Sequence, residues 1–98
     1  MNFLFLFHSA GKSRFCGGVF SDREIAEKWI SGHALTGVLT KYPLDVGVYD
    51  WAIENSYFTP NKEHQFTAEF IGGFTTAAQE HYHYENGICQ SDDSSMES

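Results

Sequence analysis

The residues best suited to chemistry form the alternating run from His81 to Glu85. An extended strand would place His81, His83 and Glu85 on one face, and two imidazoles with a carboxylate are typical ligands of zinc or a similar ion. His8, on a separate predicted strand, could supply a fourth ligand. The run has no defined metal-binding spacing, however, and polar residues are common on the solvent face of an antiparallel strand. A metal site is therefore the alternative to a partner-binding strand.

Acid–base catalysis is a second possibility for the chain. Asp50 and Glu54 could act as a carboxylate pair, but their spacing of one helical turn is also typical of a solvated helix face. Neither Gly17-Gly18 nor Gly72-Gly73 matches a phosphate-binding loop, and no pattern for a nucleophile or an oxyanion-stabilising loop is present. We expect no catalytic residue and no cofactor.

The distribution of charge favours a cationic partner. The 98 residues include 13 Asp and Glu against 6 Lys and Arg, which gives a formal net charge of -7. Acids and bases balance over residues 1–62, whereas every charged residue from Glu63 onward is an acid. This imbalance disfavours binding to nucleic acids or anionic membranes and favours a partner with a basic surface.

The predicted partner surface combines carboxylates with tyrosines and histidines. A tyrosine suits an interface because its ring can be half-buried while its hydroxyl stays in water. The residues assigned to this surface are Asp50, Glu54, Glu80, His81, Tyr82, His83, Tyr84 and Glu85. The sequence thus favours a non-catalytic binding protein.

Short apolar or alternating runs predict the strands that position these residues. The runs are residues 3–8, 15–20, 35–41 and 79–85. The first is apolar on both faces, as in a strand from the middle of a sheet. Tyr42-Pro43 should end the third strand, and an Asn86-Gly87 turn follows the fourth.

Helical spacing predicts three helices between the strands. They cover residues 22–31, the stretch from Asp45 to Glu54, and a stretch around residues 66–74 that Gly72-Gly73 shortens. Ser21 and Glu24 form a capping box for the first helix, with Phe20 and Ile25 as its hydrophobic staple. Asp45 and Thr67 are suited to cap the second and third helices.

The elements follow the order β-β-α-β-α-α-β, which predicts a single α+β domain over residues 1–89. Its sheet would be small and mostly antiparallel, with about four strands and with helices packed on one face. Trp29, Trp51 and the phenylalanines should form its core. Residues 90–98 are polar apart from one methionine and should form a disordered acidic tail, because they cannot bury enough apolar area to offset the entropy of ordering.

The sequence contains no recognisable targeting segment. Residues 2–7 are apolar, but no basic residue precedes them and they are far too few to span a bilayer. A lone pair of cysteines, Cys16 and Cys89, in a chain with its own apolar core is more typical of reduced thiols than of a disulfide. We therefore expect a cytoplasmic protein that binds no membrane.

Several stretches resemble a family of small uncharacterised bacterial proteins, and the resemblance covers most of residues 5–87. The stretches are residues 18–21, 29–30, 35–40, 42–45, 47–54 and 81–87. The resemblance implies a bacterial origin and transfers no functional residue. In size, acidity and lack of a catalytic motif, the chain is also similar to bacterial immunity proteins, including those of contact-dependent growth inhibition systems. That likeness implies a partner that is a cognate toxin, of a basic, nuclease type.

Overall fold

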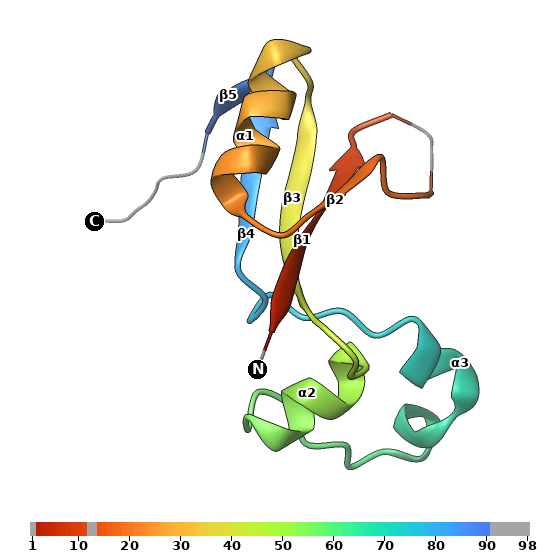
Figure 1. The fold of residues 1–98 in the computed structure, drawn as a ribbon. Helices are drawn as coiled ribbons and strands as arrows, with labels where there is room; N and C mark the ends of the chain where they lie inside the picture. The colour runs from red at the N-terminus through yellow and green to blue at the C-terminus, as the bar shows by residue number, and fades with distance from the viewer. Residues whose placement is uncertain (1, 12–13, 91–98) are drawn as a thin grey trace.

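Strand β1 (Phe3–Ser9) lies inside a five-stranded antiparallel sheet, as its two apolar faces predict. The computed structural model describes residues 2–11 and 14–90, so nearly all of the predicted tail lies outside the described residues. The other strands are β2 (Gly18–Phe20), β3 (Gly37–Pro43), β4 (His81–Glu85) and β5 (Ile88–Cys89). Their order across the sheet is β2-β1-β3-β4-β5 (Figure 1), which confirms the α+β class with one strand more than expected.

The register gives the two faces of the sheet different neighbours. On one face, Phe7, Leu39 and Tyr84 pack with Ala26 and Ile30 of helix α1 (Arg23–Gly32), and these five side chains form a buried core. Among the described residues, α1 is the only helix that lies alongside the strands (Figure 1). The opposite face is called the open face below.

Helix α1 begins one residue later than its sequence signal suggests. Asp22 is the N-cap, and its carboxylate accepts a 2.8 Å hydrogen bond from the backbone N–H of Glu24, so the predicted cap at Ser21 was wrong. Asp and Ser are similar N-cap formers, and the backbone geometry selects between neighbours. Ile25 is 54% exposed and does not act as a buried staple, whereas Ala26 and Ile30 are fully buried.

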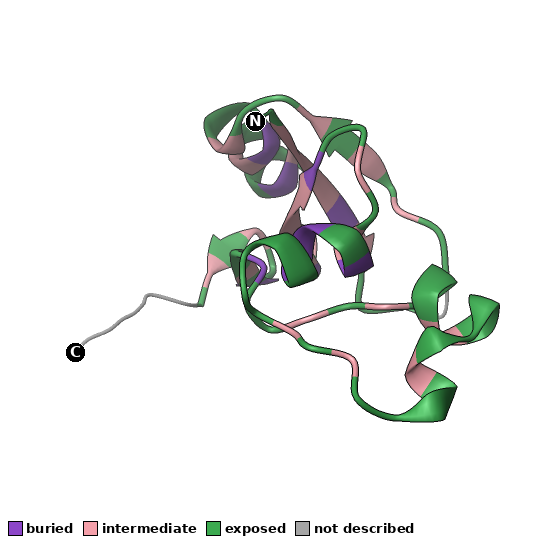
Figure 2. Cartoon of the chain, turned by 90° about the horizontal axis from the view of Figure 1, so that it is seen from below, coloured by how far each residue is buried: buried purple, intermediate pink, exposed green. Residues whose placement is uncertain are grey.

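The remaining helices lie beyond one end of the strands rather than on the sheet face (Figure 1). They are α2 (Val48–Glu54), the short 3₁₀ helix η1 (Glu63–Phe66) and α3 (Ala68–Gly72). Trp51 of α2 packs edge-on against Phe3, with ring centroids 6.3 Å apart. The buried side of α2 faces the strands while α3 is largely exposed (Figure 2).

A second aromatic cluster joins α2 to α3. The ring of Tyr49 contacts those of Phe58, Phe70 and Phe74, and its hydroxyl donates a 2.9 Å hydrogen bond to the carbonyl of Gln65. Thr67 caps α3 as predicted, because its hydroxyl accepts from the backbone N–H of Phe70. This cluster holds the short helices in place at the end of the sheet.

The β3–α2 connection confirms one predicted chain signal and corrects another. Strand β3 ends at Tyr42-Pro43 as predicted. Pro43 is its last residue, opposite Phe3, where the absence of an N–H affects only the end of the ladder. Asp45 does not cap α2: it has a positive φ of 67°, and Gly47 occupies the N-cap position without a side-chain hydrogen bond. Asp tolerates this left-handed conformation better than most residues, which suits it to the turn.

The Asn86-Gly87 turn is present as predicted, and it returns the chain into strand β5, which was not expected. Both residues have positive φ, 52° and 84°, as a type I′ hairpin turn requires. Two further expectations fail: the strand over 15–20 shrinks to β2, and Phe15 is 78% exposed instead of lying in the core. Over residues 2–11 and 14–90, no helix combines the length and the apolar character needed to cross a membrane.

Candidate protein-binding site

Strand β4 divides the residues that the sequence assigns to one partner surface. Its register turns Tyr82 and Tyr84 toward α1, and Tyr84 is only 4% exposed. His81, His83 and Glu85 point to the open face and are exposed. Because successive side chains of a strand point to opposite faces, these five residues cannot share one surface. Tyr84 serves the core, and only the open-face residues of β4 remain available to a partner there.

The tyrosines of β4 are held by charged residues of α1. The hydroxyl of Tyr84 donates a 2.6 Å hydrogen bond to Oε2 of Glu27, and Nε of Arg23 donates to the same oxygen at 3.1 Å. The Arg23 guanidinium stacks on the ring of Tyr82, 3.5 Å from its centroid. A cation over an aromatic face is attracted by the ring quadrupole. These contacts tie β4 to α1.

Glu80 continues this network toward β3. Its carboxylate accepts a hydrogen bond from the hydroxyl of Tyr82 and lies 3.7 Å from Nζ of Lys41. Burial, together with the neighbouring Glu80, raises the pKa of Tyr82 to about 12. Burial and the contact with Glu27 raise the pKa of Tyr84 as well. The hydroxyls of both tyrosines thus donate hydrogen bonds to carboxylates of the chain.

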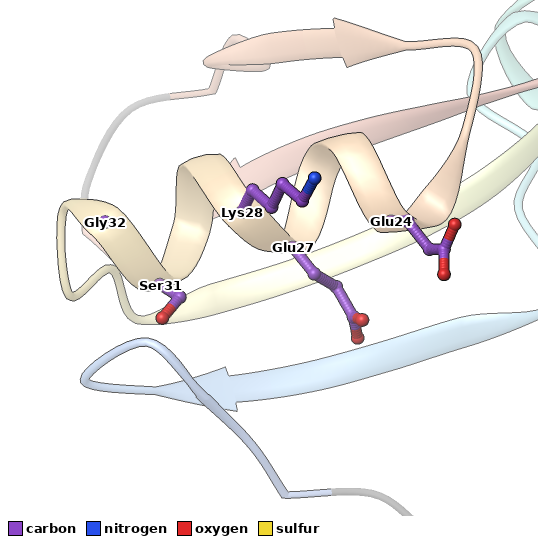
Figure 3. A pocket seen from close by; sticks show the side chains of 5 residues that line it. All are labelled: Glu24, Glu27, Lys28, Ser31 and Gly32. Atoms are coloured by element: carbon purple, nitrogen blue, oxygen red, sulfur yellow. The ribbon is translucent and has the colours of Figure 1, made fainter.

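A hollow of about 520 Å³ lies along the flank of α1 that faces β4 and β5 (Figure 3). It is lined by Glu24, Glu27, Lys28, Ser31 and Gly32. Figure 3 shows the side chains of Glu24, Glu27 and Ser31 directed toward the strands. All the described residues that line it come from α1, and they carry charges of both signs.

The open face has an apolar centre. Leu4, Leu6 and Val38 are half-buried there, and Val19 on the edge strand β2 is 55% exposed. The solvated face of an antiparallel sheet normally alternates polar residues with the buried ones of the other face. An apolar face without a covering helix is more typical of an interface.

Two adjoining hollows run along the end of the open face nearest α2 and α3, and together we call them the open-face groove. The first, of about 500 Å³, is lined by Tyr42, Gly47, Val48, Ile71, Gly72, Gly73, Phe74 and Thr75. The second, of about 300 Å³, is lined by Val38, Thr40, Tyr42, Thr75, Thr76, Ala77, Gln79 and His81. The shared residues Tyr42 and Thr75 join the two.

Gln79 fixes the wall of this groove. Its buried side chain donates a 3.2 Å hydrogen bond to the carbonyl of Lys41 and accepts one of 3.3 Å from the backbone N–H of Thr76. Buried amides need such partners, because an unsatisfied one costs about 1–3 kcal/mol. The wall is therefore attached to β3 by specific bonds. On the floor, burial raises the pKa of Tyr42, and the nearby Cys16 contributes further.

The two carboxylates predicted on α2 differ in their relation to the groove. Asp50 is exposed, and its Oδ2 lies 3.5 Å from the point where a Cβ on Gly47 would be, so the carboxylate stands beside a residue that lines the first hollow. Glu54 is exposed at the end of α2 and lines neither hollow. Asp50 does not line either hollow, but unlike Glu54 it stands beside Gly47, which does.

The alternative metal site is not assembled. The rings of His81 and His83 lie 5.4 Å apart between centroids, and Nδ1 of His81 is within 2.8 Å of the Gln79 carbonyl. His8 is separated from His83 by strand β3, since both pair with Val38 from opposite sides. Within the part of the chain that the structure describes, no group of three His, Cys, Asp or Glu residues could hold an ion.

Sequence reasoning missed most of the groove. Ile71, Val48 and Tyr42 carry ordinary apolar or aromatic side chains, and nothing in their spacing distinguishes a groove wall from a core. The one local signal is Gly72-Gly73, whose sequence pattern indicates a helix breaker. The structure shows in addition that these glycines line a hollow.

One protein family has a profile that matches residues 4–90, nearly the whole chain, and it is described as a domain of unknown function (DUF7710). No curated protein and no solved structure matches the chain. The match covers every described strand and helix apart from Phe3, the first residue of β1. The chain therefore belongs to the DUF7710 family.

Proposed function

We propose that the chain is a non-catalytic binding protein of the cytoplasm, an immunity protein that neutralises a basic, nuclease-type toxin by covering it. The observation that carries this proposal is the difference between the two faces of the sheet. Helix α1 covers one face, whereas the other presents an apolar centre and a groove. Burial of such an apolar surface against a partner favours binding by about 25 cal/mol per Å² of apolar area removed from water.

The charges of the described residues support a basic partner. The two cations nearest β4, Arg23 and Lys41, are each paired with a carboxylate of the chain, at 3.1 Å and 3.7 Å. Asp50, beside the groove residue Gly47, and Glu85, on the open face, form no ion pair with another described residue. Such carboxylates attract a basic surface and speed its association.

The geometry favours binding over catalysis. The tyrosines with raised pKa values, Tyr82 and Tyr84, point toward α1 and already donate to carboxylates of the chain. Catalytic sites place a nucleophile beside a base with a pKa near the operating pH. The open face instead offers apolar side chains with scattered polar ones, which is typical of a protein interface.

Co-expression with the product of the neighbouring open reading frame tests this proposal, because an immunity gene is expected beside its toxin gene. Calorimetric titration of the two purified proteins should give a complex whose affinity falls as salt rises. The double variant Asp50→Asn with Glu85→Gln should weaken the complex and reduce its dependence on salt. Glu24→Gln is the matched control, since Glu24 is exposed on the flank of α1.

Two results would count against the proposal. If the chain formed no complex with a basic product of the adjacent gene, the proposed immunity function would be wrong. If the complex were tight and its affinity changed neither with salt nor in the double variant, the electrostatic mechanism would be wrong.

A further inference from the structure

We infer that the open-face groove receives an apolar side chain from a partner segment in which that residue is flanked by lysine or arginine. This docking mode rests on the proposed function, because it names the chemistry of the partner's contact segment. The apolar side chain would enter the first hollow, between Tyr42, Val48 and Ile71, and a flanking cation would face Asp50.

The first hollow has the size and lining of a binding pocket. Its volume of about 500 Å³ lies within the range of roughly 300–1,000 Å³ that is usual for ligand sites. Ile71 in its wall is 38% exposed, and Val48, Phe74 and Tyr42 are half-buried. These side chains would lose their remaining contact with water when an apolar residue enters.

Gly72 lines this hollow at a position where the backbone does not require glycine. Its φ is not positive, and a Cβ at this position would meet no atom within 4 Å outside its chain neighbours and its helix's own backbone. An alanine would therefore fit the folded chain, and in a helix it would be favoured over glycine by about 1 kcal/mol. Because Gly72 lines the hollow, we expect an added methyl group to take up part of its space.

Polar groups near the groove favour particular residues on either side of the partner's apolar side chain. Asp50 is exposed beside Gly47 and forms no ion pair with a described residue, so a lysine or arginine can approach it. A second copy of this acidic chain is a poorer occupant, because its net charge of -7 opposes self-association.

The test uses three synthetic peptides as probes, acetyl-Lys-Leu-Lys-amide, acetyl-Lys-Ser-Lys-amide and acetyl-Glu-Leu-Glu-amide, titrated to millimolar concentration into the ¹⁵N-labelled chain. The first peptide should shift the amide signals of Val48, Ile71, Gly72 and Thr75 in a saturable way. The other two should not, because one lacks the apolar side chain and the other places carboxylates beside Asp50.

Gly72→Ala should weaken binding of the first peptide about tenfold. Gly32→Ala is the matched control: it makes the same exchange at another position with open space, in the hollow of α1, and should leave binding unchanged. Ile71→Ser, at an exposed position, provides a second variant that should also weaken binding.

Several results would overturn the inference. They are an absence of shifts with the first peptide, shifts confined to the α1 flank at Glu24 and Lys28, equal binding by Gly72→Ala, or dimerisation of the chain that closes the groove. If the toxin complex forms while the peptide ignores the groove, the docking mode is wrong and the proposed function stands. If the peptide occupies the groove but no basic protein forms a complex, the proposed function is wrong.

Discussion

Tyr84 and Glu27 are 57 positions apart in the sequence, yet the hydroxyl of one donates a 2.6 Å hydrogen bond to Oε2 of the other. The same oxygen accepts from Nε of Arg23 at 3.1 Å, so a single carboxylate connects β4 to two positions of α1. A hydrogen bond to a charged group is worth about 1.5–3 kcal/mol in a partly buried setting. Tyr84 thus stabilises the fold rather than a partner complex.

Tyr84→Phe should lower the free energy of unfolding by about 1–2 kcal/mol, because it removes this hydrogen bond and leaves the ring in place. Glu27→Gln should have an effect of similar size. The double variant should cost less than the sum of the two single changes, since Tyr84→Phe removes and Glu27→Gln weakens the same interaction. Denaturant unfolding measures all three, with Glu24→Gln as the control on the same helix. Additive effects of the two changes would show that the bond contributes nothing to stability.

Stability should fall at high pH because of the tyrosines of β4. A tyrosine with a raised pKa in the folded chain binds its proton more tightly there than when unfolded. Its contribution is fully present below the ordinary pKa of 10 and is lost as the pH rises through about 12, the pKa of Tyr82. The melting temperature should therefore decrease between these two pH values.

Replacing both Tyr82 and Tyr84 by phenylalanine should flatten this decrease. Tyr57→Phe is the control, since Tyr57 is exposed and lies outside the network. An equally steep decrease in the double variant would assign the alkaline loss of stability to other groups.

Gly87 should tolerate no side chain. Its φ is 84°, and a Cβ would come within 3.0 Å of the Cα of Ala34 and 3.1 Å of that of Ser31. Gly87→Ala should therefore destabilise the chain by more than about 1 kcal/mol. Gly32→Ala, where the space is open, should leave the stability unchanged or raise it. Equal effects of the two substitutions on thermal unfolding would contradict the turn geometry.

Zinc should not stabilise the chain. His81 and His83 are neighbours on the open face, but no third ligand among the described residues completes a site. Protein prepared without a histidine tag should contain no stoichiometric transition metal, and added zinc should leave its melting temperature unchanged. If zinc raised the melting temperature and His81→Ala and His83→Ala abolished that rise, the metal-site hypothesis would be supported.

The sequence predicted elements whose signals are local. The two apolar faces of β1, the stripe of Ala26 and Ile30 on α1 and the cap at Thr67 each depend on residues within a few positions of one another. Choices between neighbouring capping residues were less secure, as Asp22 and Gly47 show. There the backbone path decides among residues of similar propensity.

The candidate site was less predictable because tertiary packing creates it. Alternation correctly separated His81 and His83 from Tyr82 and Tyr84, but only the position of α1 decides which set is covered. The groove arises where β3, α2 and the segment after α3 meet, and no short stretch of sequence contains it.

Amide hydrogen exchange of the complex with a basic partner tests the central claim most directly, because it reports which backbone segments the partner covers. We predict slower exchange in the complex at Tyr42 and over residues 71–77, with no change over residues 24–32 on the flank of α1. Protection of the α1 flank, with exchange at the groove unaltered, would contradict the assignment of the open face as the binding surface.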